Sequence, residues 1–244
     1  MKITMIGKWG GYPEEHSATS SFLLEQDDFR LLVDCGSGVL SKIQQYTSPA
    51  ELNGVILSHY HHDHVADVGV LQYYTLIQTQ LGNRRDPLHF YGHTRDQKQF
   101  EALNFGNYTV AREIAEGQLQ KLGPFEVDFL PTIHPVYCLA IRLKANGKTL
   151  VYSADTEWNE ALIQFSKDAD VLICEASLYN QQKGKVSGHL TAGEVGELAN
   201  LAHVKKVILT HLPHYGKHEQ LVIEAKEKYE GEVLLAEAGL ITEC

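Results

Sequence analysis

The feature that most constrains this chain is a run of histidines that directly follows a short apolar segment. Residues 54–57 read Gly-Val-Ile-Leu, and residues 58–64 read Ser-His-Tyr-His-His-Asp-His. The apolar run is typical of a buried strand, so the histidines are expected to emerge at the rim of a sheet. Five ionisable side chains in the six positions from 59 to 64 are too many to bury without partners. The alternative interpretation is a solvated polar loop.

These side chains have the chemistry of metal ligands. Neutral imidazole and carboxylate are borderline ligands that suit zinc and its first-row neighbours. His59 and His61 stand two apart on an extended segment, so their side chains point the same way and can bind one ion. Asp63 and His64 lie just past the turn and could bind a second ion. Because four ligands do not complete two sites, the other ligands must come from elsewhere in the chain.

Three further candidate ligands stand where short apolar strands end. His134 follows residues 127–133, Asp155 follows residues 149–154, and His211 follows residues 207–210. In α/β folds the functional groups gather at the ends of strands. The chain therefore supplies the remaining ligands at three separate places.

Taken together, the seven residues resemble the ligand pattern of the metallo-β-lactamase superfamily of dinuclear metal hydrolases. The chain is most similar to the branch that contains ribonuclease Z and its small-molecule phosphodiesterase relatives. The motifs that carry this second resemblance are Gly7, Pro13, Ser20-Ser21, residues 32–36 (Leu-Val-Asp-Cys-Gly), residues 152–156 (Tyr-Ser-Ala-Asp-Thr), residues 174–177 (Cys-Glu-Ala-Ser) and residues 187–189 (Ser-Gly-His). The resemblance implies one hydrolase domain over residues 1–244, an α/β fold built as a four-layer αββα sandwich.

The resemblance also implies how the ligands are shared. One ion would be held by His59, His61 and His134, and the other by Asp63, His64 and His211. Asp155 would bridge the ions, because a carboxylate has two oxygens to share. Asp34 would brace the metal loop without touching an ion. Water between two divalent ions ionises near neutral pH, and the hydroxide attacks phosphorus or a carbonyl carbon. The nitrogen-rich ligand set favours zinc, with manganese and iron left open.

Departure of the leaving group needs a proton donor. The family's Gly-His loop implies that His189 fills this role, and Glu175, at the end of a neighbouring strand, could orient the imidazole. A flexible loop histidine is the alternative for His189. Asp63 could act as a general base instead of a ligand. Related proteins often carry His where this chain has Cys174, a departure that concerns orientation and not coordination.

The charge of the chain bears on its substrate. With 31 acidic and 21 basic residues the net charge is -10, and an acidic protein repels a polyanion unless a basic patch is localised. The basic clusters at residues 83–85 and 205–206 are short. The basic Gly/Pro-rich arm of transfer-RNA-processing relatives has no evident counterpart in residues 65–125. We therefore expect a small or cyclic phosphodiester, or a short nucleic-acid end, and no long nucleic acid.

Two other functions compete with this one. The same hydroxide would hydrolyse a thioester, a lactone or another carbonyl substrate. A non-catalytic metal-binding scaffold would predict lost ligands, and none of the seven is lost. An oxygen-reducing di-iron role is disfavoured, because that branch typically has Glu where His61 stands.

The remaining features suggest a cytoplasmic protein. The four cysteines are scattered without Cys-x-x-Cys spacing, as expected in a reducing compartment. The first seven residues are typical of a strand and not of a signal peptide, and no apolar run is long enough to span a membrane. A homodimer is suggested by the family resemblance alone.

The hydrophobic patterns also predict most of the elements. Strands are expected at residues 2–6, 20–25, 29–34, 88–91, 125–130, 136–144, 148–153, 170–174, 207–210 and 233–237. Helices are expected at residues 37–46, 65–81, 96–103, 108–117, 158–166, 191–203 and 217–229. Four histidines fit no expected coordination position: His16, His62, His89 and His93.

Overall fold

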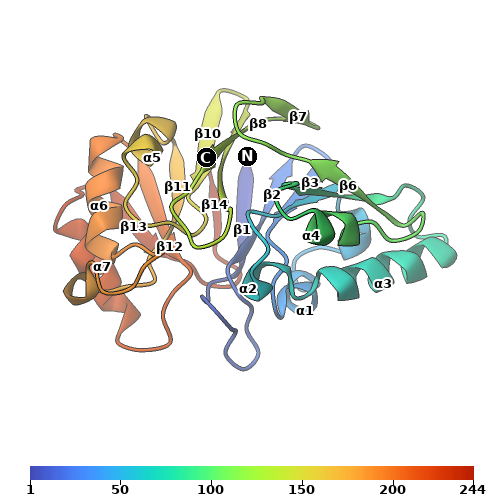
Figure 1. The fold of residues 1–244 in the computed structure, drawn as a ribbon, viewed down its shortest axis with the longest axis horizontal. Helices are drawn as coiled ribbons and strands as arrows, with labels where there is room; N and C mark the ends of the chain where they lie inside the picture. Colours follow the sequence, from blue (N-terminus) through green and yellow to red (C-terminus); the bar gives the residue numbers. More distant parts are fainter.

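Two β-sheets pack face to face in the computed structural model, which describes residues 1–244 (Figure 1). In spatial order the first sheet contains β14 (Ile241–Glu243), β1 (Lys2–Gly7), β2 (Ser21–Gln26), β3 (Phe29–Val33), β4 (Gly54–Ile56), β5 (Leu88–Gly92) and β6 (Thr109–Glu113). The second contains β13 (Glu232–Leu235), β12 (Lys206–Thr210), β11 (Val171–Glu175), β10 (Lys148–Tyr152), β9 (Leu139–Ala145), β8 (Phe125–Pro131) and β7 (Gln120–Leu122).

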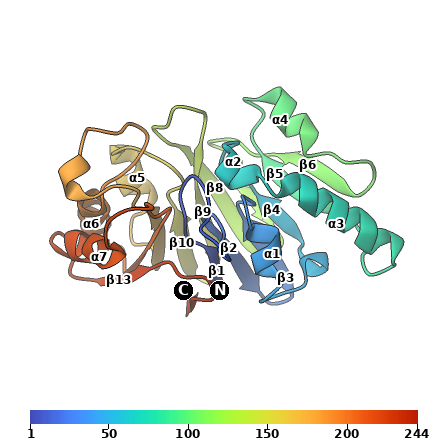
Figure 2. The same cartoon turned by 90° about the horizontal axis from the view of Figure 1, so that it is seen from below.

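Helices cover the outer face of each sheet. The first half of the chain provides α1 (Val39–Ile43), η1 (Pro49–Glu51), α2 (His62–Val65), α3 (Val68–Gln80) and α4 (Gln97–Ala102). The second half provides α5 (Glu160–Phe165), η2 (Asn180–Gln182), α6 (Ala192–Leu201) and α7 (His218–Lys226). In Figures 1 and 2 the two helical groups lie at opposite sides of the paired sheets. This arrangement confirms the expected four-layer αββα sandwich.

Side chains along each strand point alternately to the two faces of its sheet, and both faces are buried. In β2, Phe22 and Leu24 face the core between the sheets, whereas Leu23 packs under the helices of the first half. In β10, Leu150 and Tyr152 face the same central core, and Val151 packs under the opposite helices. The strands are therefore nearly continuous apolar runs, and polar groups collect where the strands end.

The ends of the chain lie side by side (Figure 1), because β14 pairs antiparallel with β1 through Lys2 and Glu243. Strands β3, β4, β5 and β6 run parallel to one another, and so do β10, β11, β12 and β13. The carboxyl ends of parallel strands meet at one edge of a sheet. The two edges therefore bring residues that are distant in sequence into one place.

One predicted helix is wrong. Residues 108–117 do not form a helix, because residues 109–113 form β6, which pairs parallel with β5 from Leu88 to Gly92. Thr109 is buried in this strand and takes part in its pairing. Pairing with β5 outweighs the weak local helical pattern, as tertiary contacts commonly do. The helix expected at 37–46 is also shorter and covers residues 39–43.

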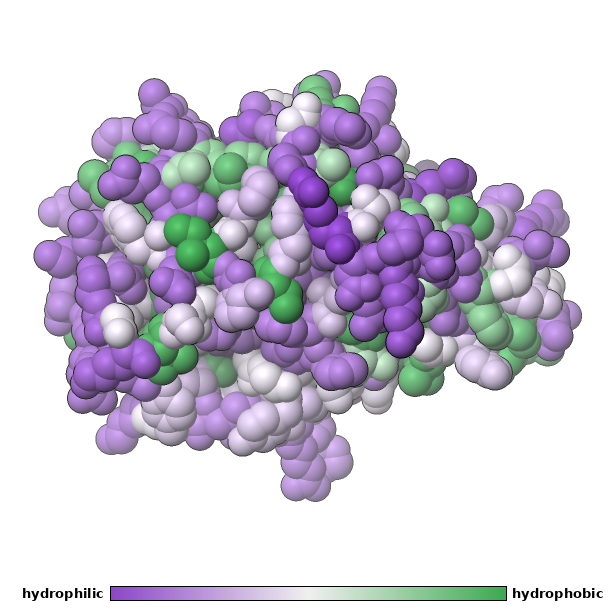
Figure 3. All heavy atoms as spheres, viewed as in Figure 1, coloured by the Kyte–Doolittle hydropathy of each residue, from purple (hydrophilic) through white to green (hydrophobic).

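One face of the molecule is mostly polar. On the face shown in Figure 3, hydrophilic residues predominate and apolar residues form small, separated groups. No helix combines the length and apolar character required to cross a bilayer. The four cysteines are all free.

Candidate metal centre

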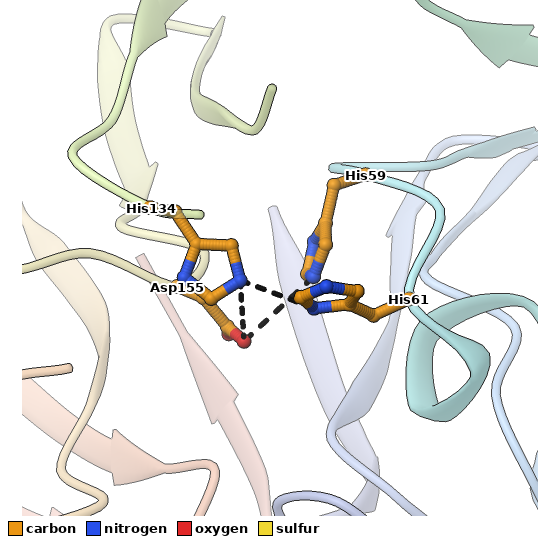
Figure 4. Close-up of side chains that lie close together, drawn as sticks. All are labelled: His59, His61, His134 and Asp155. Atoms are coloured by element: carbon orange, nitrogen blue, oxygen red, sulfur yellow. Dashed lines mark hydrogen bonds and ion pairs between the residues drawn. The ribbon is translucent and has the colours of Figure 1, made fainter. Parts of the chain in front are cut away.

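Four of the predicted ligands converge between the two sheets (Figure 4). His59 and His61 lie on the loop after β4, His134 lies after β8, and Asp155 lies after β10. One ligand atom from each lies within 4.8 Å of the others. His134 Nε2 and His61 Nδ1 are 3.1 Å apart, close to the roughly 3.3 Å spacing that two nitrogens would have around a tetrahedral zinc ion.

A second group lies beside the first. It consists of Asp63, His64 and His211, whose ligand atoms also lie within 4.8 Å of one another. Asp63 Oδ2 is 3.1 Å from His211 Nε2 and 3.5 Å from His64 Nε2. The backbone N–H of Gly11 donates a hydrogen bond to Asp63 Oδ2 at 2.8 Å and fixes the carboxylate. The structure therefore brings Asp63, His64 and His211 together as a second candidate group.

Asp155 connects the two groups. Its Oδ2 atom lies 3.3 Å from His211 Nε2 and 3.5 Å from His64 Nε2. It also lies 3.8 Å from His59 Nε2 and 3.9 Å from His134 Nε2. The carboxylate therefore faces histidines of both groups, which is the position that a bridging ligand requires.

In both histidines of the second group, the ring nitrogen that faces away from the centre forms a hydrogen bond. His64 Nδ1 donates to Asp34 Oδ2 at 2.7 Å, and His211 Nδ1 lies 2.8 Å from the Ser177 hydroxyl. That hydroxyl in turn donates to Glu175 at 2.6 Å. With Nδ1 protonated, Nε2 presents its lone pair to the centre, as in histidines that bind metals.

The first group is oriented in the same way. His59 Nδ1 lies 3.0 Å from the Ser58 hydroxyl, which donates to Asp34 at 2.9 Å. His134 Nδ1 donates to the Gly188 carbonyl at 3.0 Å. Tyr152 adds a hydrogen bond from its hydroxyl to Asp34 at 3.0 Å. These hydrogen bonds orient the rings of His59 and His134 so that the Nε2 atom of each faces the centre.

The donors fit divalent metal ions. Three buried atoms at the centre have no hydrogen-bond partner in the protein: His59 Nε2, His64 Nε2 and Asp155 Oδ1. Leaving buried polar atoms unpaired costs free energy, so such a cluster indicates a missing partner. All three orphaned atoms could donate electron pairs to a cation. The residues therefore fit one or more metal ions.

The electrostatics point the same way. Burial alone would raise the pKa of Asp155, but His211 and His64 hold it well below its ordinary value. Burial would lower the pKa of His64, but Asp155 and Asp34 raise it. The carboxylates thus draw positive charge into the centre, which bound cations would supply.

The loops that carry the ligands adopt unusual backbone conformations. Asp34, Ala154 and His211 all have left-handed φ values, of 58°, 50° and 53°. Such residues outside glycine cluster at functional sites, where the surrounding structure enforces the strain. Gly36 lies against the metal loop, and a Cβ there would be only 1.6 Å from the Asp63 carbonyl oxygen. A side chain at this position would displace the loop.

His189 lies beside the metal groups and is partly buried. Its Nδ1 is 3.0 Å from Glu175 Oε1, and its ring is stacked near that of His211 at 5.3 Å. Burial lowers the pKa of His189, but Glu175 more than offsets this and the pKa is about 9. His189 also forms a third cluster with Asp155 and His211, so the structure is compatible with a ligand role as well.

The other histidines singled out in the sequence, His16, His62, His89 and His93, lie outside all of these clusters. Gly11, Ser177 and Tyr152 support the centre by hydrogen bonds. Ser177 and Tyr152 belong to motifs of the family resemblance, but no role is predicted for either, and no sequence feature points to Gly11. Their roles depend on contacts between residues that are 34 to 118 positions apart.

The fold and the site define the class of protein. The model of the beta-lactamase superfamily domain matches residues 29–212, and the chain belongs to this family. Together with the site, the relatives described below make it a metallo-hydrolase of the β-lactamase fold with a candidate His/Asp metal site.

Among individual proteins, the chain is 44% identical to the probable metallo-hydrolase YhfI of Bacillus subtilis, and the alignment covers 100% of both chains. The crystal structure of YhfI, a metallo-beta-lactamase fold protein, superposes with a TM-score of 0.96, at 42% identity over 100% of this chain and 99% of that one. Ribonuclease Z of Methanosarcina acetivorans is 27% identical over 97% of this chain and 96% of the archaeal protein. A diphosphatase of the PhnP family shares the fold, with a TM-score of 0.77, 17% identity and coverage of 100% and 97%.

Proposed function

We propose that the protein is a dinuclear metal-dependent phosphodiesterase that acts on a small or cyclic phosphodiester or on a short nucleic-acid end. The observation that carries this proposal is the pair of ligand groups on either side of Asp155. His59, His61 and His134 would hold one ion, and Asp63, His64 and His211 the other. The predominance of nitrogen donors favours zinc.

The bound ions would lower the pKa of water toward neutrality and neutralise charge that develops on the reacting group. The protein's own residues fix where this happens. The N–H of Gly11 donates a hydrogen bond to Asp63 Oδ2, the same oxygen that lies 3.1 Å from His211 Nε2. Its second oxygen could accept a proton, which is the general-base role considered for this residue.

His189 supplies a proton donor in this proposal. Glu175 accepts a hydrogen bond from Nδ1, and its own position is fixed by the backbone N–H of Thr156 and by the Ser177 hydroxyl. The Glu175 carboxylate raises the pKa of His189 against the effect of burial, which favours the protonated imidazole. Nε2 could then protonate the departing alkoxide, for which general acid catalysis typically contributes about 100- to 10,000-fold.

Charge and chain length favour a small substrate. The net charge of -10 disfavours a long polyanion. The alignment with the archaeal ribonuclease Z runs over 297 positions, although this chain has only 244 residues. The archaeal protein therefore carries inserted segments that this chain lacks. Ribonuclease Z and the diphosphatase are both named for the cleavage of phosphate esters or anhydrides, which favours phosphorus over carbonyl carbon.

The test is a substrate comparison with metal-loaded protein. Bis(4-nitrophenyl) phosphate, cyclic nucleotides and short oligonucleotides would be assayed beside thioesters and lactones at equal concentration. We expect turnover of at least one small phosphodiester, and its loss in Asp155→Ala. Turnover confined to the carbonyl substrates, or to long RNA, would overturn the proposal.

A further inference from the structure

A tight turn at residues 10–12, called the N-terminal turn below, lies directly against the second ligand group. The Tyr12 N–H donates to the Gly10 carbonyl at 2.9 Å, across Gly11 at a φ of 73°. This is the pattern of a γ-turn with a left-handed central residue, which is rare and strained. The N–H of Gly11 donates to Asp63 Oδ2 at 2.8 Å. A Cβ on Gly10 would lie only 2.6 Å from His211 Nδ1, so the turn contacts two members of the group.

His214 forms hydrogen bonds to both ends of this turn. Its Nε2 atom lies 3.1 Å from the Gly10 carbonyl oxygen and 2.8 Å from the Tyr12 carbonyl oxygen. Carbonyl oxygens only accept hydrogen bonds, so Nε2 carries a proton and donates to both. The two carbonyls flank Gly11. One side chain therefore links the residues on either side of the N–H that reaches Asp63.

Two aromatic rings fix the position of the His214 ring. The Trp9 ring is stacked on it at 4.5 Å with 10° between the planes, and the Tyr12 ring at 3.8 Å with 4°. Two rings so close and so nearly parallel would overlap on one face of an imidazole, so His214 lies between them. Trp9 is buried, and its Nε1 donates to the Ser17 hydroxyl at 2.9 Å. The stack is therefore anchored in the body of the protein.

The N-terminal turn has little packing of its own. On one side, backbone hydrogen bonds join it to the loop after β12: Leu212 N–H to the Lys8 carbonyl at 2.7 Å and Gly10 N–H to the Leu212 carbonyl at 3.2 Å. On the other side, Gly11 and Tyr12 are exposed, and so are residues 14–16. The hydrogen bonds from His214 therefore hold the part of the turn that the backbone pairing does not reach.

We propose that His214 is a positioning residue for the second ligand group: it holds the N-terminal turn closed, so that Gly11 orients Asp63 Oδ2 toward the ion. This inference rests on the proposed function, because it concerns one of the two ions of that centre. A carboxylate oxygen can accept from Gly11 and still offer an electron pair to a cation. Because a ligand that is oriented beforehand loses less freedom on binding, opening the turn lowers the affinity of this group for its ion.

The experiment titrates the protein with zinc in competition with a chromophoric chelator, which resolves the two binding steps. His214→Phe keeps a ring between Trp9 and Tyr12 but loses the N–H. We expect it to weaken one step by about 3- to 10-fold, the range that one hydrogen bond supplies, and to leave the other step unchanged. His214→Gln places an amide N–H near the position of Nε2 and should restore most of the affinity.

His218→Phe is the matched control. The His218 ring also lies beside Trp9, with centroids 5.2 Å apart, but its Nε2 donates to the Pro213 carbonyl at 2.7 Å and not to the N-terminal turn. We expect both zinc-binding steps to be unchanged in this variant. An equal loss of affinity in His218→Phe and His214→Phe would assign the effect to the aromatic packing and overturn the inference.

The Gly11 amide reports on the turn itself. In metal-free protein labelled with ¹⁵N-glycine, solvent exchange of this N–H measured by NMR should be about 3- to 10-fold faster in His214→Phe than in the native protein. Exchange in His214→Gln should stay close to the native rate. An unchanged rate in His214→Phe would show that His214 does not hold the turn, and would refute the inference.

Neither measurement uses a substrate, so this inference and the proposed function can fail separately. If His214→Phe weakens one zinc-binding step and speeds exchange at Gly11, but the native protein hydrolyses no phosphodiester, the role of His214 stands and the phosphodiesterase function falls. If the native protein binds only one ion, or if His214→Phe binds two ions as tightly as the native protein does, the role of His214 is refuted whatever the hydrolysis shows.

Discussion

Asp34 and His64 form a completely buried hydrogen-bonded pair, with 2.7 Å between Asp34 Oδ2 and His64 Nδ1. Asp34 also accepts hydrogen bonds from the backbone and hydroxyl of Ser58 and from Tyr152. Because Tyr152 belongs to the second sheet, the pair ties the metal loop to both halves of the core. The orientation of His64 is therefore set by residues that do not touch the ion site.

Asp34→Asn tests this orientation. The amide keeps the shape of the carboxylate but loses its charge and turns one acceptor into a donor. Removing such a partner of a metal ligand typically weakens metal affinity by about 10- to 100-fold. Competition with a zinc chelator would measure the change, and Asp28→Asn in the exposed hairpin turn is the control. Unaltered affinity in Asp34→Asn would mean that the pair serves folding alone.

His189→Ala tests the proton donor. We expect kcat to fall by about 100- to 10,000-fold, with the metal content unchanged, because the other seven residues complete the two ligand groups. A substrate with a very acidic leaving group should be affected least, since it needs no proton. Loss of metal together with activity would instead make His189 a ligand, which its cluster with Asp155 and His211 allows.

Asp170 offers a test of the structure away from the site. It accepts hydrogen bonds from the Thr149 N–H and from Lys148 and Lys205, all within 3.2 Å. Burial opposes ionisation, but these contacts outweigh it and lower the pKa to about 2. Because the folded pKa is depressed, the stabilisation is present above about pH 4 and is lost as the pH falls toward 2.

Asp170→Asn should therefore reduce the free energy of unfolding by about 1–2 kcal/mol at pH 7. The difference between variant and native protein should shrink as the pH is lowered toward 2. Denaturant titrations at several pH values would measure it. A difference that does not depend on pH would attribute the effect to packing and not to charge.

The structure brings the candidate ligands together, and most of them could be picked out in the sequence because they stand near the ends of strands. The apolar runs before His59, His134, Asp155 and His211 identify strands locally, and the parallel arrangement brings their ends together. The bracing role of Asp34 followed from the family resemblance, and the structure shows its contact with His64.

What could not be predicted depends on pairings between distant segments. Residues 109–113 form an edge strand only because β5 provides a partner, and a local pattern holds no information about that partner. The short strands β7 and β14 are not predicted either, because three residues are too few to show a hydrophobic pattern. The burial of both ring nitrogens of His93 is a property of the folded chain, and the sequence around residue 93 gives no sign of it.

Two ions are expected to share Asp155, and counting the metal in purified protein tests this directly. Elemental analysis of the native chain, isolated without chelators or reconstituted with zinc, should find about two ions per chain. Asp155→Ala should lower this number and abolish hydrolysis of a chromogenic phosphodiester. A native protein that stays free of metal after reconstitution, or an Asp155→Ala variant that keeps both ions and full turnover, would contradict the account.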